Sequence, residues 1–356
     1  MSTVAPFEVA GLVISEIDVR AMTDQEIAAG NEFGNKMAAE SNPEDPPTPL
    51  DVAIAETRTL PDFLVVRLFR AVAPSGEVAA SASINWTLTD ENAHLAFVSI
   101  RVLPEFRRRG IAKGLLGMVV EAVEADNRSV IIGPTSDRVA AGEAFARRVG
   151  ADPGLAMHTN RLELAAVDWD LVGRWVAEAP ARAPGYSLVA VDGAYPDDIV
   201  EAVVDVLHVM NDAPRDALDM EDQQMTVEQM REFEKNAAAS KSEHWSLFVR
   251  HDDSDRLVGL TDVWWNPAQP ETVWQGNTGV RPEYRGHALG KWLKAVMLER
   301  ILSERPEAKD IRTGNADSND AMLAINRELG FKPYIANMNW QVSTEKVRDY
   351  LSGSSR

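Results

Sequence analysis

Alternating apolar and polar positions predict two similar series of β-strands along the chain. In the second half the predicted strands are "WSLFVR", "RLVGLTDVWW" and "TVWQGNTGV", and the polar turn "HDDSD" separates the first two. In the first half "DFLVVRLFRAV", "VAASASINW" and "AHLAFVSIRV" follow the same plan, with "APSGE" as the first turn. Acidic segments with helical spacing precede the strands, for example residues 197–212. Each half is therefore expected to begin with helices and to continue with three strands.

The remainder of each half also follows one order of elements. The third strand runs into a turn of basic and small residues and then into an amphipathic helix, as in "VRPEYRGHALGKWLKAVMLE" at residues 280–299. A short strand follows ("SVIIGPT" or "DIRTGNA"), then a helix ending at Gly150 or Gly330, then a last strand ("MHTNRLEL" or "NMNWQV"). This order predicts an α/β (α+β) fold, in which a mixed, mostly antiparallel sheet is flanked by helices.

The two halves are copies of one sequence unit. At an offset of 178 positions the following residues correspond: Pro104 and Pro282, Phe106 and Tyr284, Arg107 and Arg285, Trp86 and Trp264. A period this long indicates a duplicated domain rather than a solenoid. We therefore predict an N-terminal domain at residues 1–166, a helical linker at residues 167–184, and a C-terminal domain at residues 185–356. Pro180 and Pro184 are expected to end the linker helix.

Composition and charge exclude several classes of protein. The chain has 356 residues, no cysteine and a formal net charge of −19. Without a thiol it can form neither a disulfide nor an acyl-thiol enzyme, and its negative charge would repel nucleic acids and anionic membranes. No apolar run approaches the length that spans a bilayer, and the first residues lack a basic signal region, which predicts a cytoplasmic protein. We expect a monomer or a homodimer, and no metal site, because His244 and His251 lack metal-ligand spacing with neighbouring acids.

The turn after the third strand is the strongest candidate for a binding site. Its pattern in the two copies is Arg107-x-x-Gly110-x-Ala112 and Arg285-x-x-Ala288-x-Gly290. Small residues let consecutive backbone N–H groups converge, and the start of the following helix adds about half a positive charge. The pattern is neither a Walker loop nor a dinucleotide-binding fingerprint. We predict a phosphate-binding turn; the alternative is an ordinary strand–helix connection with solvated arginines.

The element order, with "VRPEYRGHALGKWL" and "TGNADSNDAMLAINRELGF", resembles the GNAT superfamily of N-acetyltransferases, twice over nearly the entire chain, in the manner of actinobacterial tandem GNAT proteins. The resemblance implies that the turn holds the pyrophosphate of acetyl-coenzyme A (acetyl-CoA). It also implies that the preceding strand pairs with the pantetheine arm, and that a backbone N–H at a splay in that strand polarises the thioester carbonyl. The implied cofactor-binding residues of the second copy are Gly279, Val280, Arg281, Arg285, Gly286, His287, Ala288, Gly290, Lys291 and Asn319. Those of the first copy are Arg107, Arg108, Arg109, Gly110, Ala112 and Lys113.

The chain departs from the family at one catalytic position. Many members carry a tyrosine there that protonates the leaving thiolate, and counting back from Gly330 places Asn326 at this position. In the first copy the residue is Ala146, and Val139 replaces the family's asparagine. Asparagine can hydrogen-bond to sulfur but is a poor acid, whereas alanine can do neither. We therefore expect catalysis in the second copy, while the turn of the first copy can still hold the cofactor.

An acceptor amine with a pKa near 10.4 is protonated at pH 7, so its deprotonation costs roughly 4 to 5 kcal/mol and calls for a base. We predict Asp212 or Glu221 as this base, with Asp219, Asp222 and His208 as further candidates; each could instead be a solvated or helix-face residue. Residues 192–234 contain thirteen acidic and two basic residues, which would attract a cationic acceptor. The alternative is that this acidity only serves solubility.

Two functions remain open at this stage. The first is an N-acetyltransferase that transfers the acetyl group of acetyl-CoA to a primary amine of a small, cationic molecule, by direct attack in a ternary complex in the C-terminal domain. The second is a non-catalytic acyl-CoA-binding or interaction protein with degenerate active sites, which the missing tyrosines favour. Trp264 and Trp265 are adjacent on one predicted strand, so they must face opposite sides of the sheet, one in the core and the other available to an acceptor cleft.

Overall fold

The computed structural model describes residues 5–353, and these residues form two compact units. Unit 1 comprises residues 5–156, 215–221 and 337–353, and unit 2 comprises residues 157–214 and 222–336. The units are therefore not contiguous in the sequence. The predicted division at residues 1–166, 167–184 and 185–356 follows the sequence repeat, whereas each compact unit includes residues from both copies of that repeat.

Unit 1 contains a mixed sheet covered by helices. Its strands are β1 (Phe7–Val9), β2 (Leu12–Ile17), β3 (Leu64–Val72), β4 (Val78–Thr87), β5 (Leu95–Val102) and β6 (Val130–Ser136), completed by part of β13 (Lys332–Ser343). Its helices are α1 (Asp24–Ser41), α2 (Leu50–Arg58), α3 (Ile111–Ala125), α4 (Ala140–Val149) and α10 (Thr344–Ser352). Short 3-10 turns, η1 (Val19–Ala21) and η2 (Pro104–Phe106), follow β2 and β5. Only β5 and β6 pair in parallel in this sheet, and the other registers are antiparallel.

Unit 2 repeats this arrangement. Its strands are β8 (Tyr186–Asp192), β9 (Glu243–His251), β10 (Arg256–Trp265), β11 (Thr272–Val280) and β12 (Asp310–Ala316), completed by part of β7 (Asp152–Glu163). Its helices are α5 (Trp169–Arg182), α6 (Val200–Leu207), α7 (Val227–Ala239), α8 (Leu289–Glu304) and α9 (Asp320–Leu329), with the 3-10 turns η3 (Leu164–Ala166), η4 (His208–Asp212) and η5 (Pro282–Tyr284). β11 and β12 are parallel and the other registers are antiparallel. The predicted fold class is confirmed.

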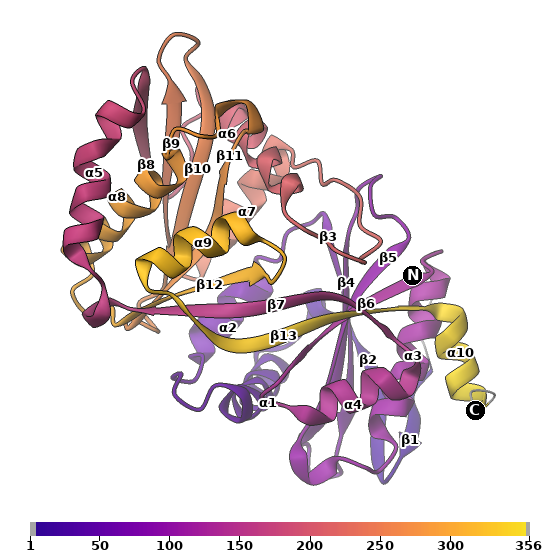
Figure 1. Ribbon diagram of the computed structural model, residues 1–356. Helices are drawn as coiled ribbons and strands as arrows, with labels where there is room; N and C mark the ends of the chain where they lie inside the picture. Colours follow the sequence, from indigo (N-terminus) through magenta and orange to yellow (C-terminus); the bar gives the residue numbers. More distant parts are fainter. Residues whose placement is uncertain (1–4, 354–356) are drawn as a thin grey trace. The chain divides into compact units, whose positions relative to one another are not determined.

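The last strand of each sequence copy completes the sheet that the other copy begins (Figure 1). Residues 157–163 of β7 pair with all of β12, with Arg161 opposite Arg312. In the same way residues 337–343 of β13 pair with β6, with Gln341 opposite Ile132. The two copies therefore exchange their final strands. A period of two along a strand does not record which neighbour the strand will have, so the repeat alone could not reveal this exchange.

The predicted linker at residues 167–184 forms α5, which packs against α8 in unit 2 (Figure 1). It is the counterpart of α10, which packs against α3 in unit 1. At an offset of 175 positions, Asp168 and Ser343 cap the two helices, and Val172 and Val347 are both fully buried. The prediction that Pro180 ends the helix is wrong, because α5 continues to Arg182. A proline so close to a helix end removes only one late backbone hydrogen bond, and burial of the flanking Ala179 and Ala183 compensates for it.

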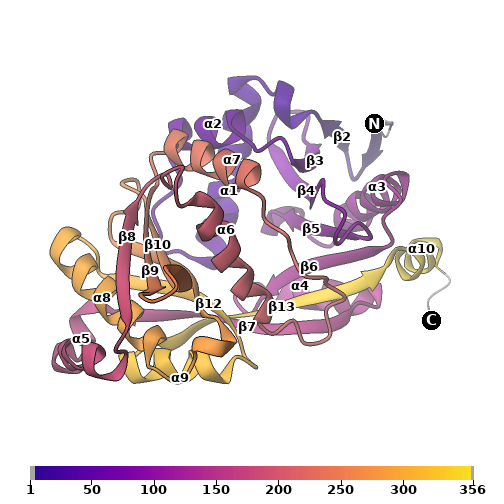
Figure 2. The same cartoon turned by 90° about the horizontal axis from the view of Figure 1, so that it is seen from above.

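Helices cover both faces of the unit 2 sheet (Figure 2). On one face Leu247, Val249 and Val263 pack with α8, and on the other Phe248 and Leu260 pack with α6 and α7. Trp265 joins the first of these cores. Trp264 lies on the opposite face, where its ring stacks on His244 with centroids 3.9 Å apart, so the prediction that the two indoles face opposite sides is confirmed.

Candidate functional site

The loops before α3 and α8 have the same backbone conformation. After the 3-10 turn, two residues of each loop have positive φ: Arg108 (63°) and Gly110 (83°) in unit 1, and Gly286 (91°) and Ala288 (57°) in unit 2. Neither Gly110 nor Ala288 caps its helix through a side chain. The first backbone bond of α8 runs from Trp292 N to Ala288 O at 3.0 Å, which leaves the N–H groups before it without an intrahelical acceptor. Both loops therefore have a backbone conformation that presents free amide groups, as anion-binding turns do.

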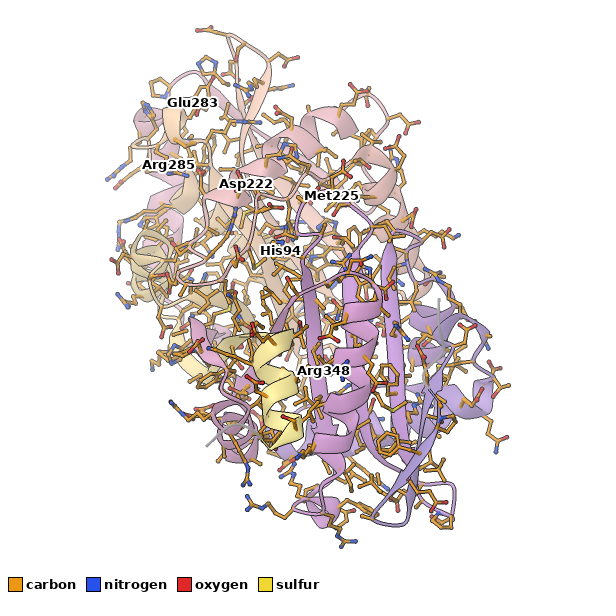
Figure 3. All side chains as sticks on the ribbon, turned by 90° about the vertical axis from the view of Figure 1, so that its right-hand side faces the viewer. His94, Asp222, Met225, Glu283, Arg285 and Arg348 are labelled. Atoms are coloured by element: carbon orange, nitrogen blue, oxygen red, sulfur yellow. The ribbon has the colours of Figure 1, made fainter. Side chains whose placement is uncertain are left out.

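An arginine anchors each loop in the same way. In unit 2 this residue is Arg285, which is labelled in Figure 3. Arg285 Nε donates to Val280 O at 2.8 Å and its Nη2 donates to Asp212 Oδ2 at 2.8 Å. In unit 1, Arg107 Nε donates to Val102 O at 3.0 Å, and its guanidinium pairs with both oxygens of Glu40. The Glu40 carboxylate raises the pKa of Arg107. These arginines hold the loops closed on the preceding strand, and Arg285 remains half exposed toward solvent.

Other predicted loop residues of unit 2 also have protein partners. Arg281 Nη2 donates to Asp205 at 2.6 Å, and the His287 ring lies 5.5 Å from the ring of Tyr186. Lys291 forms an ion pair with Glu328 of α9, and its ammonium lies 4.6 Å from the ring centroid of Trp175 on α5. Gly290 lies in the first turn of α8. A Cβ added there would meet Ile325 Cδ1 at 3.4 Å, a van der Waals contact.

The equivalent residues of unit 1 lie in a similar setting. Arg109 Nη2 donates to Glu105 O at 2.7 Å, and its guanidinium stacks on Phe106. Lys113 lies over the ring of Tyr350 at 5.3 Å, as Lys291 does over Trp175, and Ala112 belongs to the first turn of α3. The structure thus brings the loop residues of each copy together within one unit. Their predicted contacts with acetyl-CoA remain predictions.

Next to each loop, two parallel strands separate after a short stretch of pairing. β11 and β12 pair only from Thr272 and Asp310 to Trp274 and Arg312, and β5 and β6 pair only from residues 95 and 130 to residues 97 and 132. From there to the loop, the backbone of β11 is no longer paired with β12, and the backbone of β5 is no longer paired with β6. Gly279 lies in this free part of β11, where a Cβ would come within 2.6 Å of Val209, and Val280 packs on the core beneath α8.

The asparagine predicted to face the leaving group is buried in unit 2. Asn326 is 1% exposed, and its Nδ2 donates to Asn315 Oδ1 on β12 at 2.8 Å. Its Oδ1 has no hydrogen-bond partner among residues 5–353. Asn160 on β7, a strand from the other copy, also donates to Asn315 at 3.2 Å. Asn319, predicted to contact pantetheine, caps α9 by accepting a hydrogen bond from Met322 N at 3.3 Å.

The predicted bases do not lie together. Asp212 is in unit 2, where it is paired with Arg285. Glu221 belongs to unit 1, where its carboxylate accepts a hydrogen bond from Asn92 N at 2.6 Å; Asp219 is also in unit 1 and lies 3.3 Å from His94. His208 has a buried Nε2 that lacks a hydrogen-bond partner in the described chain. Of the two predicted bases Asp212 and Glu221, only Asp212 lies in the same unit as Asn326.

Two buried ionisable residues of unit 2 were not predicted from the sequence. Lys294 on α8 is 2% exposed and donates to Gln275 Oε1 at 2.7 Å, and burial lowers its pKa to about 7. Asp262 on β10 is 2% exposed, and burial raises its pKa to about 6. Asp262 is the one charged residue in "LVGLTDVWW", the apolar run that follows Arg256, and this is a sequence signal that could have identified it.

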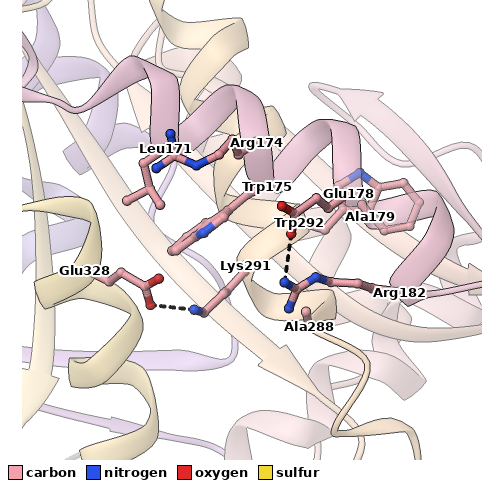
Figure 4. Close-up of a pocket in the computed structure, with 10 residues that line it drawn as sticks. All are labelled: Leu171, Arg174, Trp175, Glu178, Ala179, Arg182, Ala288, Lys291, Trp292 and Glu328. Atoms are coloured by element: carbon pink, nitrogen blue, oxygen red, sulfur yellow. Dashed lines mark hydrogen bonds and ion pairs between the residues drawn. The ribbon is translucent and has the colours of Figure 1, made fainter.

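A cavity of about 200 Å³ adjoins the unit 2 loop (Figure 4). Lys291 pairs with Glu328 on its wall, and Arg182 pairs with Glu178 at 2.7 Å. The indoles of Trp175 and Trp292 supply its apolar surface. The lining residues are Leu171, Arg174, Trp175, Glu178, Ala179, Arg182, Ala288, Lys291, Trp292 and Glu328. The cavity offers aromatic rings and cations next to the anion-binding turn, so the residues fit a molecule that joins a diphosphate to an aromatic base.

Among residues 5–353, no group of three or more His, Cys, Asp or Glu side chains is arranged to hold a metal ion. No helix in this part of the chain combines the length and apolar character required to cross a bilayer.

Comparison with known proteins agrees with this geometry. Residues 36–151 match the model of the acetyltransferase (GNAT) family. No curated protein matches the sequence. A tandem GNAT protein from the clavulanic acid biosynthesis pathway has 25% sequence identity and a TM-score of 0.76, covering 93% of this chain and 98% of that one.

Two more distant structures share the fold alone. A GCN5-related N-acetyltransferase from Sphaerobacter thermophilus has 14% identity and a TM-score of 0.64, over 93% of this chain and 96% of that chain. A GCN5-related glucosamine N-acetyltransferase region of a fungal multi-domain GH3 β-N-acetylglucosaminidase has 11% identity and a TM-score of 0.63, over 94% of this chain and 38% of that chain. The fold is one that supports acyl transfer. Residues 36–151 thus match the GNAT acetyltransferase family, and the chain as a whole is similar in fold to a tandem GNAT protein.

Proposed function

We propose that the protein is an N-acetyltransferase that transfers the acetyl group of acetyl-CoA to a primary amine of a small, cationic molecule, and that transfer takes place in unit 2. The observation that carries this proposal is the unit 2 loop, whose left-handed residues Gly286 and Ala288 place uncapped helix amides beside the gap between β11 and β12. A diphosphate at the amides and an extended arm along β11 would together direct a thioester into that gap.

Different residues around the loop would bind different parts of acetyl-CoA. The turn from Gly286 to Lys291 would receive the diphosphate, with Arg285 adding positive charge at its edge. The cavity lined by Trp175 and Trp292 would receive the nucleotide end, because indole rings stack on aromatic bases. The free backbone of β11 beyond Trp274 would pair with the amide-containing arm. When bound, acetyl-CoA supplies the activated acetyl group, and the chain supplies its position.

The reaction proposed is direct attack within a ternary complex. The neutral amine nitrogen forms a bond to the thioester carbonyl carbon, the carbon–sulfur bond breaks, and the thiolate leaves. One proton passes from the amine to water or to a carboxylate of the acidic segment at residues 192–234, and one proton returns to the sulfur. Asn326 can donate a hydrogen bond to that sulfur but cannot supply its proton. Asp212 serves the loop, since its carboxylate accepts a hydrogen bond from the Arg285 guanidinium and anchors that side chain.

The preference for a small cationic acceptor rests on charge. The acidic segment contains α6 and the first part of α7, and its excess of carboxylates would concentrate a cation near the unit 2 site. The tandem GNAT protein of comparable structure carries a name that places it in the biosynthesis of a small molecule, which supports an acceptor of that class. A polyamine, an aminoglycoside-like compound or a peptide amine fits this description.

One observation favours a second function, a non-catalytic acyl-CoA binder. Asn326 occupies the position of the proton donor, is buried, and leaves its Oδ1 without a partner. Incubating the protein with acetyl-CoA and a panel of amines, and following thiol release, separates the two functions. Thiol release that depends on one class of amine supports the transferase. Binding of acetyl-CoA in a calorimeter without release across the panel would support the binder, and no heat with any acyl-CoA would refute both.

A further inference from the structure

The buried carboxylate of Asp262 is tied to the neighbouring strand. Asp262 points to the face of the sheet that carries Trp264, away from α8. Its Oδ1 accepts a hydrogen bond from Asn277 N at 3.1 Å, and its Oδ2 accepts one from Asn277 Nδ2 at 2.9 Å. A hydrogen bond with the Trp264 side chain also stabilises its charged form. The carboxylate thus has donors from two strands, β10 and β11.

These contacts lie at a β-bulge. Thr261 is opposite Thr278, but Val263 is opposite Gln275, so β11 has one more residue than β10 in this interval. Gly276 and Asn277 therefore stand opposite Asp262 alone. A Cβ on Gly276 would lie 2.1 Å from Asp262 Oδ1, so the close approach of carboxylate and backbone requires glycine. Asp262, Gly276 and Asn277 specify the bulge together.

The bulge lies where β11 leaves its parallel partner. Pairing with β12 ends at Trp274, and Gly276, two residues later, is exposed. The corresponding strands of unit 1 have no bulge in this interval, because β4 and β5 keep one register from Asn85 opposite Phe97 through Ala80 opposite Val102. At the offset of 178 positions Asp262 corresponds to Ile84, a fully buried apolar residue. The two units therefore differ in backbone at the gap, and the difference coincides with one carboxylate.

We propose that Asp262 is a positioning residue of the unit 2 site, whose buried carboxylate holds the Gly276–Asn277 bulge and thereby aims the peptide groups of β11 at the thioester. The inference rests on the proposed function, since it assigns this role within acyl transfer. It also explains why unit 2, rather than unit 1, is the unit that transfers the acetyl group. A buried carboxylate hydrogen-bonded only to neutral donors costs stability, and a specific backbone geometry accounts for its presence.

The experiment compares three variants with wild type in acetyl transfer to the best amine of the panel. Asp262→Ile introduces the unit 1 residue and removes both acceptors. Asp262→Asn keeps one acceptor oxygen but places its own amide donor opposite the Nδ2 donor of Asn277. In the double variant Asp262→Asn with Asn277→Asp, donor and acceptor exchange places and the pair of hydrogen bonds can reform. Ile84→Val, at the matching position of unit 1, is the control for a small loss of core packing.

The measurements are kcat, KM for acetyl-CoA, CoA affinity and the ¹³C shift of bound [1-¹³C]acetyl-CoA. Since losing one preorganised donor to a developing oxyanion lowers kcat by about 10²-fold to 10³-fold, we expect a drop of about 10²-fold in kcat for Asp262→Ile. CoA affinity should stay within about twofold, because the phosphate turn is not altered, and the bound carbonyl shift should move toward that of free acetyl-CoA. Asp262→Asn should fall in between, and the double variant should recover at least tenfold of the loss.

The pH profile adds a readout that a purely structural role would not move. Two ionisable groups lie on the same face of the sheet as Asp262: His244 on β9, which stacks on Trp264 and whose pKa burial lowers to about 4, and Tyr195 before α6, whose pKa burial raises. Tyr195 also feels the charge of Glu234 on α7. If the ionised carboxylate holds the bulge, wild-type kcat should decline as pH falls through about 6, and Asp262→Asn should lose this limb.

Each outcome decides one of the two ideas. If Asp262→Ile and Asp262→Asn keep kcat within about threefold of wild type, or if the double variant recovers nothing, the positioning role is wrong while the transferase stands. If Asp262→Ile fails to fold, Asp262→Asn and the double variant still decide. If wild type binds acetyl-CoA without turnover, the proposed transfer fails, and an unchanged carbonyl shift in Asp262→Asn then refutes the positioning role separately. If wild type binds no acyl-CoA, both fail.

Discussion

Replacing Lys294 with methionine tests whether unit 2 buries a lysine that gives up its proton near neutral pH. Lys294 is 2% exposed, its Nζ donates to Gln275 Oε1 at 2.7 Å, and no carboxylate contributes to its pKa, which burial lowers from 10.5 to about 7. The folded state therefore binds fewer protons than the unfolded chain between pH 7 and pH 10.5. Stability must rise with pH across this window, and the cost of burying the charge is fully present below pH 7.

The magnitude follows from the two pKa values. Because one pKa unit corresponds to about 1.4 kcal/mol, the lysine destabilises the fold by about 4 kcal/mol at pH 7 and by about 2 kcal/mol at pH 9, relative to a side chain that does not titrate. Methionine has a similar length and no charge, although it leaves Gln275 Oε1 without its donor. The difference in unfolding free energy between wild type and Lys294→Met should therefore shift by about 2 kcal/mol in favour of wild type from pH 7 to pH 9.

Urea unfolding followed by tryptophan fluorescence measures this difference. Seven of the nine tryptophans belong to unit 2, so their emission reports mainly on that unit; they are Trp169, Trp175, Trp245, Trp264, Trp265, Trp274 and Trp292. Lys235→Met, at an exposed lysine of α7, is the control and should shift the difference little between the two pH values. A difference for Lys294→Met that stays constant from pH 7 to pH 9 would refute the argument, because it would mean that Lys294 keeps its ordinary pKa in the folded state.

Three further predictions concern the unit 2 site. Gly290→Val should abolish CoA binding in unit 2 because a branched side chain blocks close approach to the amides, and calorimetry that finds unchanged affinity would show that the turn is misplaced; Ala112→Val makes the same test in unit 1. Arg285→Ala should weaken CoA binding about tenfold in calorimetry, because it removes a charge-assisted contact and the anchor to Asp212. Equal affinity would mean that Arg285 holds the loop in the free protein but does not contact CoA. For a cationic acceptor, kcat/KM should drop strongly as salt rises, and a flat response would exclude steering by residues 192–234.

Local sequence was sufficient for much of this fold. The spacing of apolar residues and the offset of 178 positions predicted two copies of one order of strands and helices, and residues 5–353 contain that order twice. The expectation that each half begins with helices is wrong, because β1 and β2 precede α1 and β8 precedes α6. The turns of small residues before α3 and α8 were also recognisable from the sequence, and their binding of phosphate stays a prediction. The small residues Gly110, Gly286 and Ala288 adopt positive φ, a property decided within a few residues of chain, although Arg108 does so without any such signal. The misplaced end of α5 at Pro180 shows the limit of local rules where flanking residues are buried.

The sequence by itself determined the duplicated architecture and the two turns of small residues before α3 and α8, because these depend on hydrophobic period and backbone preference over short distances. Only the tertiary structure decided that β7 and β13 each complete the sheet of the other sequence copy. It also decided that Asp212 anchors Arg285 and that Glu221 belongs to unit 1. It alone revealed the burial of Asp262 and Lys294 and the bulge opposite Asp262. Strand partners and the surroundings of a charge depend on residues far away in the chain, and the free energy of these long-range contacts leaves no periodic trace in the sequence.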